Sequence, residues 1–171
     1  MTLMKACPGC GFVLDDLAGA DIGRALREVA PRFQVVLASH DDDRLRAHPN
    51  PSEWSALEYA CHVRDVLLIQ RDRVLLALVE ERPEFPSMHR EERVALARYA
   101  SEPPSLVAEE VAFAAGLLAR LFDGLGAVHL ARRCVYGYPD RNEVDVAWVG
   151  RHTVHEAEHH LRDVRRVLGP T

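Results

Sequence analysis

Four long stretches of the chain repeat apolar residues every three or four positions, and this periodicity constrains the fold more than any other feature. A helix with one apolar face must bury that face against another element. Four such helices bury their faces most simply against one another. The sequence therefore predicts an all-α fold, an antiparallel four-helix bundle. The expected helices cover residues 20–40, about 52–81, 105–123 and 143–168.

Local signals refine this prediction. Ser55 and Glu58 match a capping box at the start of the second helix. Pro31 lies inside the first helix and is expected to kink or restart it. A short helix is expected within residues 89–101, whereas residues 132–142 (RRCVYGYPDRN) are expected to be irregular.

Composition limits the class of protein. The 171 residues, of which 48% are hydrophobic and 27% charged, suit one soluble globular domain. A net charge of −5 argues against a nucleic-acid partner, and no apolar run is long enough for a membrane span. Because no secretory signal is evident either, we expect a cytoplasmic protein. Its four cysteines are then expected to be thiols or metal ligands rather than disulfides.

The opening residues differ from the rest of the chain. CPGCG carries Cys7 and Cys10 in a turn typical of zinc knuckles, in which glycine lets backbone N–H groups approach the thiolates. We therefore divide the chain into a zinc-knuckle-like segment, residues 1–16, and a bundle, residues 17–171. One such cysteine pair is half of a four-ligand structural zinc site. The remaining ligands could be Cys61, Cys134, a histidine such as His40 or His48, or the same cysteine pair of a second subunit.

The last helix contains two overlapping metal-type spacings within HTVHEAEHHLRDV, residues 152–164. His155 and His159, with Glu156 after the first of them, form the H-E-x-x-H signature of zinc peptidases. Glu156 and His160 form a second pair, one residue further on. In both pairs the two residues are four apart, so each pair lies on one helix face.

The apolar stripe of this helix favours one pair. At about 100° per residue, His160 falls inside the apolar arc and Glu156 lies at its edge. His155 and His159 share the opposite, arginine-bearing side and are expected to face solvent. We therefore favour Glu156 and His160 as the inward pair, and keep an H-E-x-x-H metallohydrolase as the weaker alternative.

His62 supplies the third candidate ligand. A catalytic zinc site usually has three protein ligands and one open position. His62 lies on the apolar stripe of the second helix, where a hydrogen-bonded core histidine is the ordinary alternative. Together with the inward pair it favours a metal site of His62, Glu156 and His160. Zinc is the first choice, and nickel, iron or manganese also suit these ligands.

Two segments resemble the ligand-bearing helices of the DinB-like metalloprotein superfamily. SEWSALEYACHVRDVL, residues 52–67, is similar to a segment in which a tryptophan precedes a helix whose histidine is the first metal ligand. EAEHHLRDV, residues 156–164, is similar to the last helix of that family. Its Glu-x-x-x-His-x-x-Asp pattern resembles the mycothiol-dependent maleylpyruvate isomerase branch. In commoner members both last-helix ligands are histidines, which keeps His155 and His159 as the alternative pair.

The resemblance implies a function. Related proteins are thought to bind the thiol of a low-molecular-weight cofactor, such as mycothiol or bacillithiol, at a divalent metal. Coordination removes the proton of the thiol, and the thiolate attacks a small electrophile. We therefore expect a thiol-dependent S-transferase or isomerase. The alternative is a metal-binding or stress-associated interaction protein without catalysis. A homodimer is compatible with the resemblance.

Further residues are expected around this site. Asp65 and Asp163 follow the two ligand histidines by three residues and are candidates to orient them. Tyr136, Tyr138 and Trp148 are candidates to shape an electrophile pocket, with ordinary packing as the favoured alternative.

Overall fold

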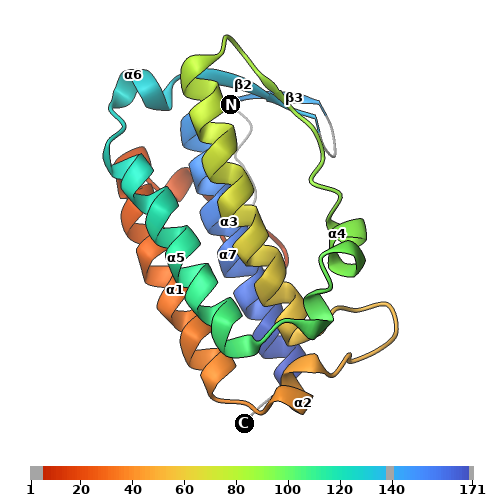
Figure 1. The fold of residues 1–171 in the computed structure, drawn as a ribbon. Coiled ribbons are helices and arrows are strands. Elements are labelled where there is room, and N and C mark those ends of the chain that lie inside the picture. Colours follow the sequence, from red (N-terminus) through yellow and green to blue (C-terminus); the bar gives the residue numbers. More distant parts are fainter. Residues whose placement is uncertain (1–5, 138–140, 170–171) are drawn as a thin grey trace.

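The computed structural model describes residues 6–137 and 141–169, in which four long helices form a bundle (Figure 1). Helices α1 and α3 each pack against both α5 and α7. The prediction of a four-helix bundle is confirmed. None of the helices in the described ranges combines the length and the apolar content that a bilayer span requires. The four are α1 (Ile22–Ala38), α3 (Ala56–Val79), α5 (Pro104–Asp123) and α7 (Val146–Leu168).

The helices do not simply alternate in direction. In Figure 1, α1 and α7 run one way along the bundle and α3 and α5 run the other way. The reason is the connection between α3 and α5, which crosses the length of the bundle instead of turning back. The expected antiparallel arrangement therefore holds for α1 with α5 and for α3 with α7, and is wrong for α3 with α5 and for α1 with α7. The crossing connection contains β1 (Glu84–Phe85), α4 (Arg90–Leu96) and the short helix η3 (Tyr99–Ser101).

Local capping fixes where the two site-bearing helices begin. The Ser55 hydroxyl accepts a hydrogen bond from the Glu58 N–H at 3.3 Å, and the Glu58 carboxylate accepts one from the Ser55 N–H at 2.8 Å, as the capping box predicts. At the start of α7, the Asp145 carboxylate accepts a hydrogen bond from the Trp148 N–H at 2.7 Å. Pro31 lies inside α1, which continues past it, so the expected restart is not found.

A small sheet lies across one end of the bundle (Figure 1). Strands β2 (Arg133–Tyr136) and β3 (Asn142–Asp145) pair antiparallel, and β1 pairs parallel with β2. The prediction of an irregular segment at residues 132–142 is therefore wrong. Strands of four residues or fewer carry almost no periodic signal, and these depend on a partner some 50 residues earlier for part of their pairing. Two short helices complete the fold, α2 (Asp42–Arg46) and α6 (Ala127–Leu130).

The segment before the bundle lies against α7. It contains the short helices η1 (Leu14–Asp16) and η2 (Gly19–Asp21). The Arg151 guanidinium of α7 donates a hydrogen bond to the Leu17 carbonyl at 2.8 Å, and Phe12 packs against the core. This segment therefore covers part of the α7 surface that the helical pattern alone assigns to solvent.

Candidate metal centre

Three candidate ligands meet between two facing helices. His62 projects from α3, and Glu156 and His160 project from α7 one turn apart. Their nitrogen and oxygen atoms all lie within 4.8 Å of one another. His62 is 2% exposed and His160 is 7% exposed. The structure therefore brings together the three residues that the helical patterns select.

The spacing of these atoms suits a bound ion better than a hydrogen bond. His160 Nε2 lies 3.7 Å from a Glu156 carboxylate oxygen, beyond hydrogen-bonding distance. Two nitrogen or oxygen ligands of a tetrahedral zinc ion, at ~2.1 Å each, lie about 3.4 Å apart. Moreover, the Nδ1 atom of His62 is buried without a hydrogen-bond partner among the described residues. An unpaired buried nitrogen costs free energy, so hydrogen bonds within the described residues do not account for the burial of this ring.

The protonation states of the group also suit a divalent cation. Burial, with a smaller contribution from His160, lowers the pKa of His62 to about 3. Burial raises the pKa of the Glu156 carboxyl, but the neighbouring His160 and His152 outweigh this and lower it to about 2. His62 is therefore neutral and Glu156 ionised at neutral pH. Burial lowers the pKa of His160, but the contacts with Asp163 and Glu156 outweigh it and raise the pKa.

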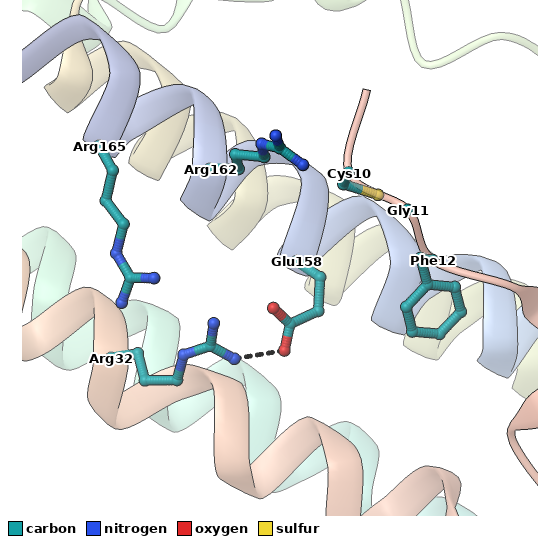
Figure 2. A pocket seen from close by; sticks show the side chains of 7 residues that line it. All are labelled: Cys10, Gly11, Phe12, Arg32, Glu158, Arg162 and Arg165. Carbon is teal, nitrogen blue, oxygen red and sulfur yellow. Dashed lines mark hydrogen bonds and ion pairs between the residues drawn. The ribbon is translucent and has the colours of Figure 1, made fainter. Parts of the chain in front are cut away.

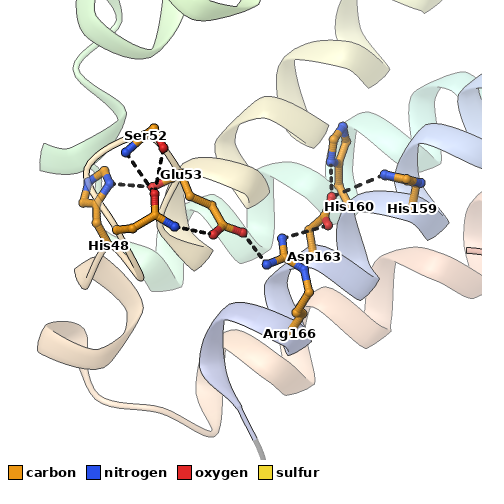
Figure 3. A network of polar contacts seen from close by, with 8 residues as sticks. His48, Ser52, Glu53, His159, His160, Asp163 and Arg166 are labelled. Carbon is orange, nitrogen blue, oxygen red and sulfur yellow. Dashed lines mark hydrogen bonds and ion pairs between the residues drawn. The ribbon is translucent and has the colours of Figure 1, made fainter. Parts of the chain in front are cut away.

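Asp163 orients His160. Its carboxylate lies 3.0 Å from Nδ1 of His160, which leaves Nε2 directed at Glu156. Arg166 donates a hydrogen bond to the other oxygen of Asp163 at 3.1 Å and forms an ion pair with Glu53 (Figure 3). The predicted orienting contact of Asp163 is thus present, and a second layer of charge holds it in place.

Asp65 has a different role from the one predicted for it. Its carboxylate accepts hydrogen bonds from the Tyr99 hydroxyl at 2.6 Å and from the Arg64 guanidinium at 3.0 Å. No hydrogen bond joins it to His62 within the described ranges. Asp65 on α3 therefore binds a residue of the segment that precedes α5. The expectation that Asp65 orients His62 is wrong.

Two aromatic rings pack on the candidate ligands. The Trp54 ring contacts His62 edge to face at a centroid distance of 5.1 Å, and the Tyr59 ring stacks on His160 at 5.4 Å. An aromatic ring therefore packs against each of the two imidazoles. The pattern analysis overlooked Tyr59, although it precedes His62 by three residues and so lies on the same face of α3.

A cavity of about 440 Å³ borders His62 and Glu156. It lies between α3, α7, β2 and the residues 86–91 that lead into α4. The Tyr136 hydroxyl, predicted as a pocket group, lines it and contacts Gln70 and the Arg73 guanidinium, the latter at 3.1 Å. Tyr138 falls outside the described residues. Two of the three candidate ligands, His62 and Glu156, therefore face a space large enough for a small organic molecule.

His152 is a cavity residue that the pattern analysis overlooked. Its Nε2 atom lies 3.7 Å from the Glu156 carboxylate, one turn earlier on α7. Trp148, predicted to shape the pocket, stacks on the His152 ring at a centroid distance of 4.7 Å and is not itself among the cavity-lining residues. The signal was available, because His152, Glu156 and His160 recur at a spacing of four residues.

Comparison with known proteins places the fold. A family model of the DinB superfamily matches residues 25–164. The chain belongs to the DinB superfamily. Among solved structures, YfiT from Bacillus subtilis matches this DinB chain with a TM-score of 0.76 and 17% identity over 86% of each chain. YfiT is described as "a probable metal-dependent hydrolase with an unusual four-helix bundle topology". At this identity the match establishes a shared fold. A comparison with curated proteins finds no match.

The cysteine pair of this DinB chain lies beside the other two histidines of α7. The sulfur atoms of Cys7 and Cys10 and the ring nitrogens of His155 and His159 lie within 4.8 Å of one another. The expectation that the two histidines face solvent is wrong, because the N-terminal segment covers them and leaves their side chains only 15% and 31% exposed. Cys61 and Cys134 are buried elsewhere in the fold, so they do not complete the pair.

Proposed function

We propose that this DinB chain is a metal-dependent enzyme that activates the thiol of a low-molecular-weight cofactor, for S-transfer to a small electrophile or for isomerisation of one. The observation that carries the proposal is a group of three donors, one with an unpaired buried nitrogen, at the edge of a 440 Å³ cavity. Three protein ligands leave a coordination position for a substrate, as in catalytic zinc sites.

Each residue has a defined part in this proposal. His62, Glu156 and His160 hold the ion, and Asp163 keeps Nδ1 of His160 occupied so that Nε2 is free to bind. A divalent ion at this position supplies Lewis acidity, which lowers the pKa of a thiol or water bound to it.

The cavity walls define what kind of substrate fits. Arg73 and the Tyr136 hydroxyl offer a cation and a polar hydrogen to carboxylate or carbonyl groups of the thiol or the electrophile. Val66 and Met88 supply apolar surface for the rest of a small molecule.

A hydrolase is the second candidate. It is favoured by the description of YfiT, and by His152, whose Nδ1 atom is buried without a hydrogen-bond partner among the described residues. A neutral imidazole at the cavity edge is suited to accept a proton from an attacking water. A metal-binding protein without catalysis is the third candidate.

The test measures two reactions on metal-reconstituted protein. Consumption of mycothiol, bacillithiol or coenzyme A is followed with monochlorobimane as the electrophile, and release of nitrophenol from p-nitrophenyl acetate is followed without thiol. We expect thiol consumption that falls at least ~100-fold in His62→Ala and is unchanged in His129→Ala, an exposed histidine on α6. Ester cleavage that needs no thiol and is lost in His62→Ala would favour the hydrolase. If neither reaction occurs, the non-catalytic metal-binding protein is favoured.

A further inference from the structure

The second group of donors has the composition and spacing of a closed zinc site. Cys7 Sγ lies 3.5 Å from Nδ1 of His159. In a tetrahedral zinc site with a sulfur at ~2.3 Å and a nitrogen at ~2.0 Å, these two ligands lie about 3.5 Å apart. The remaining donors, Cys10 and His155, lie within 4.8 Å of both. Two thiolates and two imidazoles form one of the standard ligand sets of structural zinc.

The turn that carries the cysteines already has a knuckle conformation. The Gly11 N–H donates a hydrogen bond to the Cys7 carbonyl at 2.7 Å, and the Cys7 N–H donates to the Phe12 carbonyl at 2.9 Å. Gly11 has a φ of 77°, which favours glycine. These bonds close the loop so that both sulfur atoms point toward α7.

Close approach of this turn to α7 also depends on glycine. A Cβ atom at Gly9 would lie 2.6 Å from Cε1 of His159, closer than such contacts occur. Any other residue would displace the turn or the ring. Gly9 therefore permits the distance at which the Cys7 sulfur and the His159 ring meet.

The two histidines have few other partners. Both ring nitrogens of His155 are buried and without a hydrogen-bond partner within the described residues. The Phe12 ring packs against the His155 ring at a centroid distance of 5.6 Å. Nε2 of His159 lies 3.6 Å from the Asp163 carboxylate, on the side of the ring away from Cys7. A carboxylate behind the second nitrogen is the usual support of a metal-binding histidine.

The surroundings add no competing donor from the N-terminal side. Figure 2 shows Cys10, Gly11 and Phe12 lying along α7 beside a hollow lined mainly by charged side chains. The acidic group in that hollow, Glu158, forms an ion pair with Arg32. On this side, cations rather than further ligands therefore lie beside the four donors; on the other side, the Glu156 carboxylate lies 3.6 Å from Nδ1 of His155.

We propose that Cys7, Cys10, His155 and His159 bind one zinc ion in a closed, four-ligand site that fastens the N-terminal segment to α7. All four positions belong to the protein, so the site is structural rather than catalytic. The soft thiolates select zinc over magnesium, calcium or manganese. The H-E-x-x-H histidines are then structural ligands, with no part in a peptidase site. This inference is independent of the proposed function.

Cobalt substitution tests the site separately from the bundle site. Protein purified with reductant is stripped of metal and titrated with Co²⁺, because thiolate ligation gives a near-ultraviolet charge-transfer band. His62, Glu156 and His160 offer no sulfur and cannot produce this band. We expect one equivalent of Co²⁺ to produce the band and zinc to abolish it. The band should be lost in Cys10→Ser and retained in His62→Ala.

Further variants identify the ligands. We expect His155→Ala and His159→Ala each to weaken the band-forming affinity for Co²⁺ at least ~100-fold, with far-ultraviolet circular dichroism confirming the helical fold. No band in the unaltered protein would overturn the proposal. So would a band of full strength in both histidine variants, since the thiolates would then bind metal with other partners. A Cys7–Cys10 disulfide that persists in the reduced, zinc-supplemented protein would also overturn it.

Discussion

The two donor groups of α7 occupy neighbouring faces of one helix and differ in how they are completed. Glu156 and His160 are completed across the bundle by His62, and the resulting three-donor group borders a cavity. His155 and His159 are joined by two thiols of the N-terminal segment, so that all four donors of the second group come from the protein. A shift of one residue along a helix therefore separates a group with an open position from a group without one.

The groups also differ in what holds them in place. His62 and His160 belong to long helices whose burial is largely apolar, so their positions do not depend on an ion. The cysteines belong to a short turn with few anchors besides Phe12 and the Arg151 hydrogen bond. We infer that metal at the first group serves chemistry, whereas metal at the second group serves folding of the N-terminal segment.

The largest expected effects come from replacing each of two adjacent histidines, His159 and His160, separately. His160→Ala should remove the metal of the bundle group and reduce activity at least ~100-fold, yet leave the thiolate–cobalt band intact. His159→Ala should weaken the band-forming affinity for Co²⁺ at least ~100-fold and retain most of the activity. Metal content and activity of the two variants, measured side by side, check this. Loss of both properties in both variants would mean that the groups are not separate sites.

Metal removal should loosen the N-terminal segment before it affects the bundle. We expect a chelator to speed proteolytic cleavage before residue 17 about 10-fold or more, while helix content falls little. Iodoacetamide should then modify two of the four thiols. Cys61 and Cys134 should resist, because they are fully buried and burial raises their thiol pKa to about 12 and about 11. Mass spectrometry of the fragments and adducts gives the result. Equal labelling of all four thiols would contradict it.

A smaller effect is expected from the residue that orients His160. Asp163→Asn should weaken metal binding at the bundle group by about 10- to 100-fold, because the amide holds the imidazole less strongly than the carboxylate. Asp65→Asn is the matched control, since Asp65 follows His62 at the same spacing but bonds Tyr99 and Arg64 instead. Metal titrations of both variants should show weakening in the first only. Equal weakening would assign both residues the same role.

The smallest effect is expected from the knuckle glycine. Gly9→Ala should weaken Co²⁺ binding at the thiolate group by roughly 10-fold, because the added methyl group displaces the turn from His159. Pro8→Ala, at the neighbouring exposed position, serves as the control and should change affinity little. Unchanged affinity in Gly9→Ala would mean that the turn binds metal at a different distance from α7.

Much of the bundle could be predicted from sequence because each long helix encodes its own face. The capping box at Ser55 and the stripes through His62 and His160 are local patterns, and local patterns survive folding. The strands could not be predicted, because each is too short to show a period, and the pairing of β1 with β2 joins residues some 50 positions apart. The direction of α5 depends on the path of the segment that connects it to α3. The spacing of apolar residues contains no information on that path.

The same distinction applies to the candidate ligands. The helical wheel placed Glu156 and His160 inward because that inference needs only α7 itself. The wheel assigned His155 and His159 to solvent because it considers one helix alone, whereas the N-terminal segment packs over this face of α7. A signal was present in the number of ligands. CPGCG supplies only two of the four ligands of a structural zinc site, and the two histidines of H-E-x-x-H supply only two of the three protein ligands of a catalytic one. Matching incomplete ligand sets would have paired them.

The interleaving of the two histidine pairs on α7 restricts how the length of this helix can vary. One residue inserted between Glu156 and His159 would turn everything beyond it by about 100° and separate both pairs at once. A deletion there would do the same in the opposite direction. Substitutions can alter either group alone, but insertions and deletions in this stretch cannot. We therefore expect this turn of α7 to keep its length in any related chain that keeps both groups.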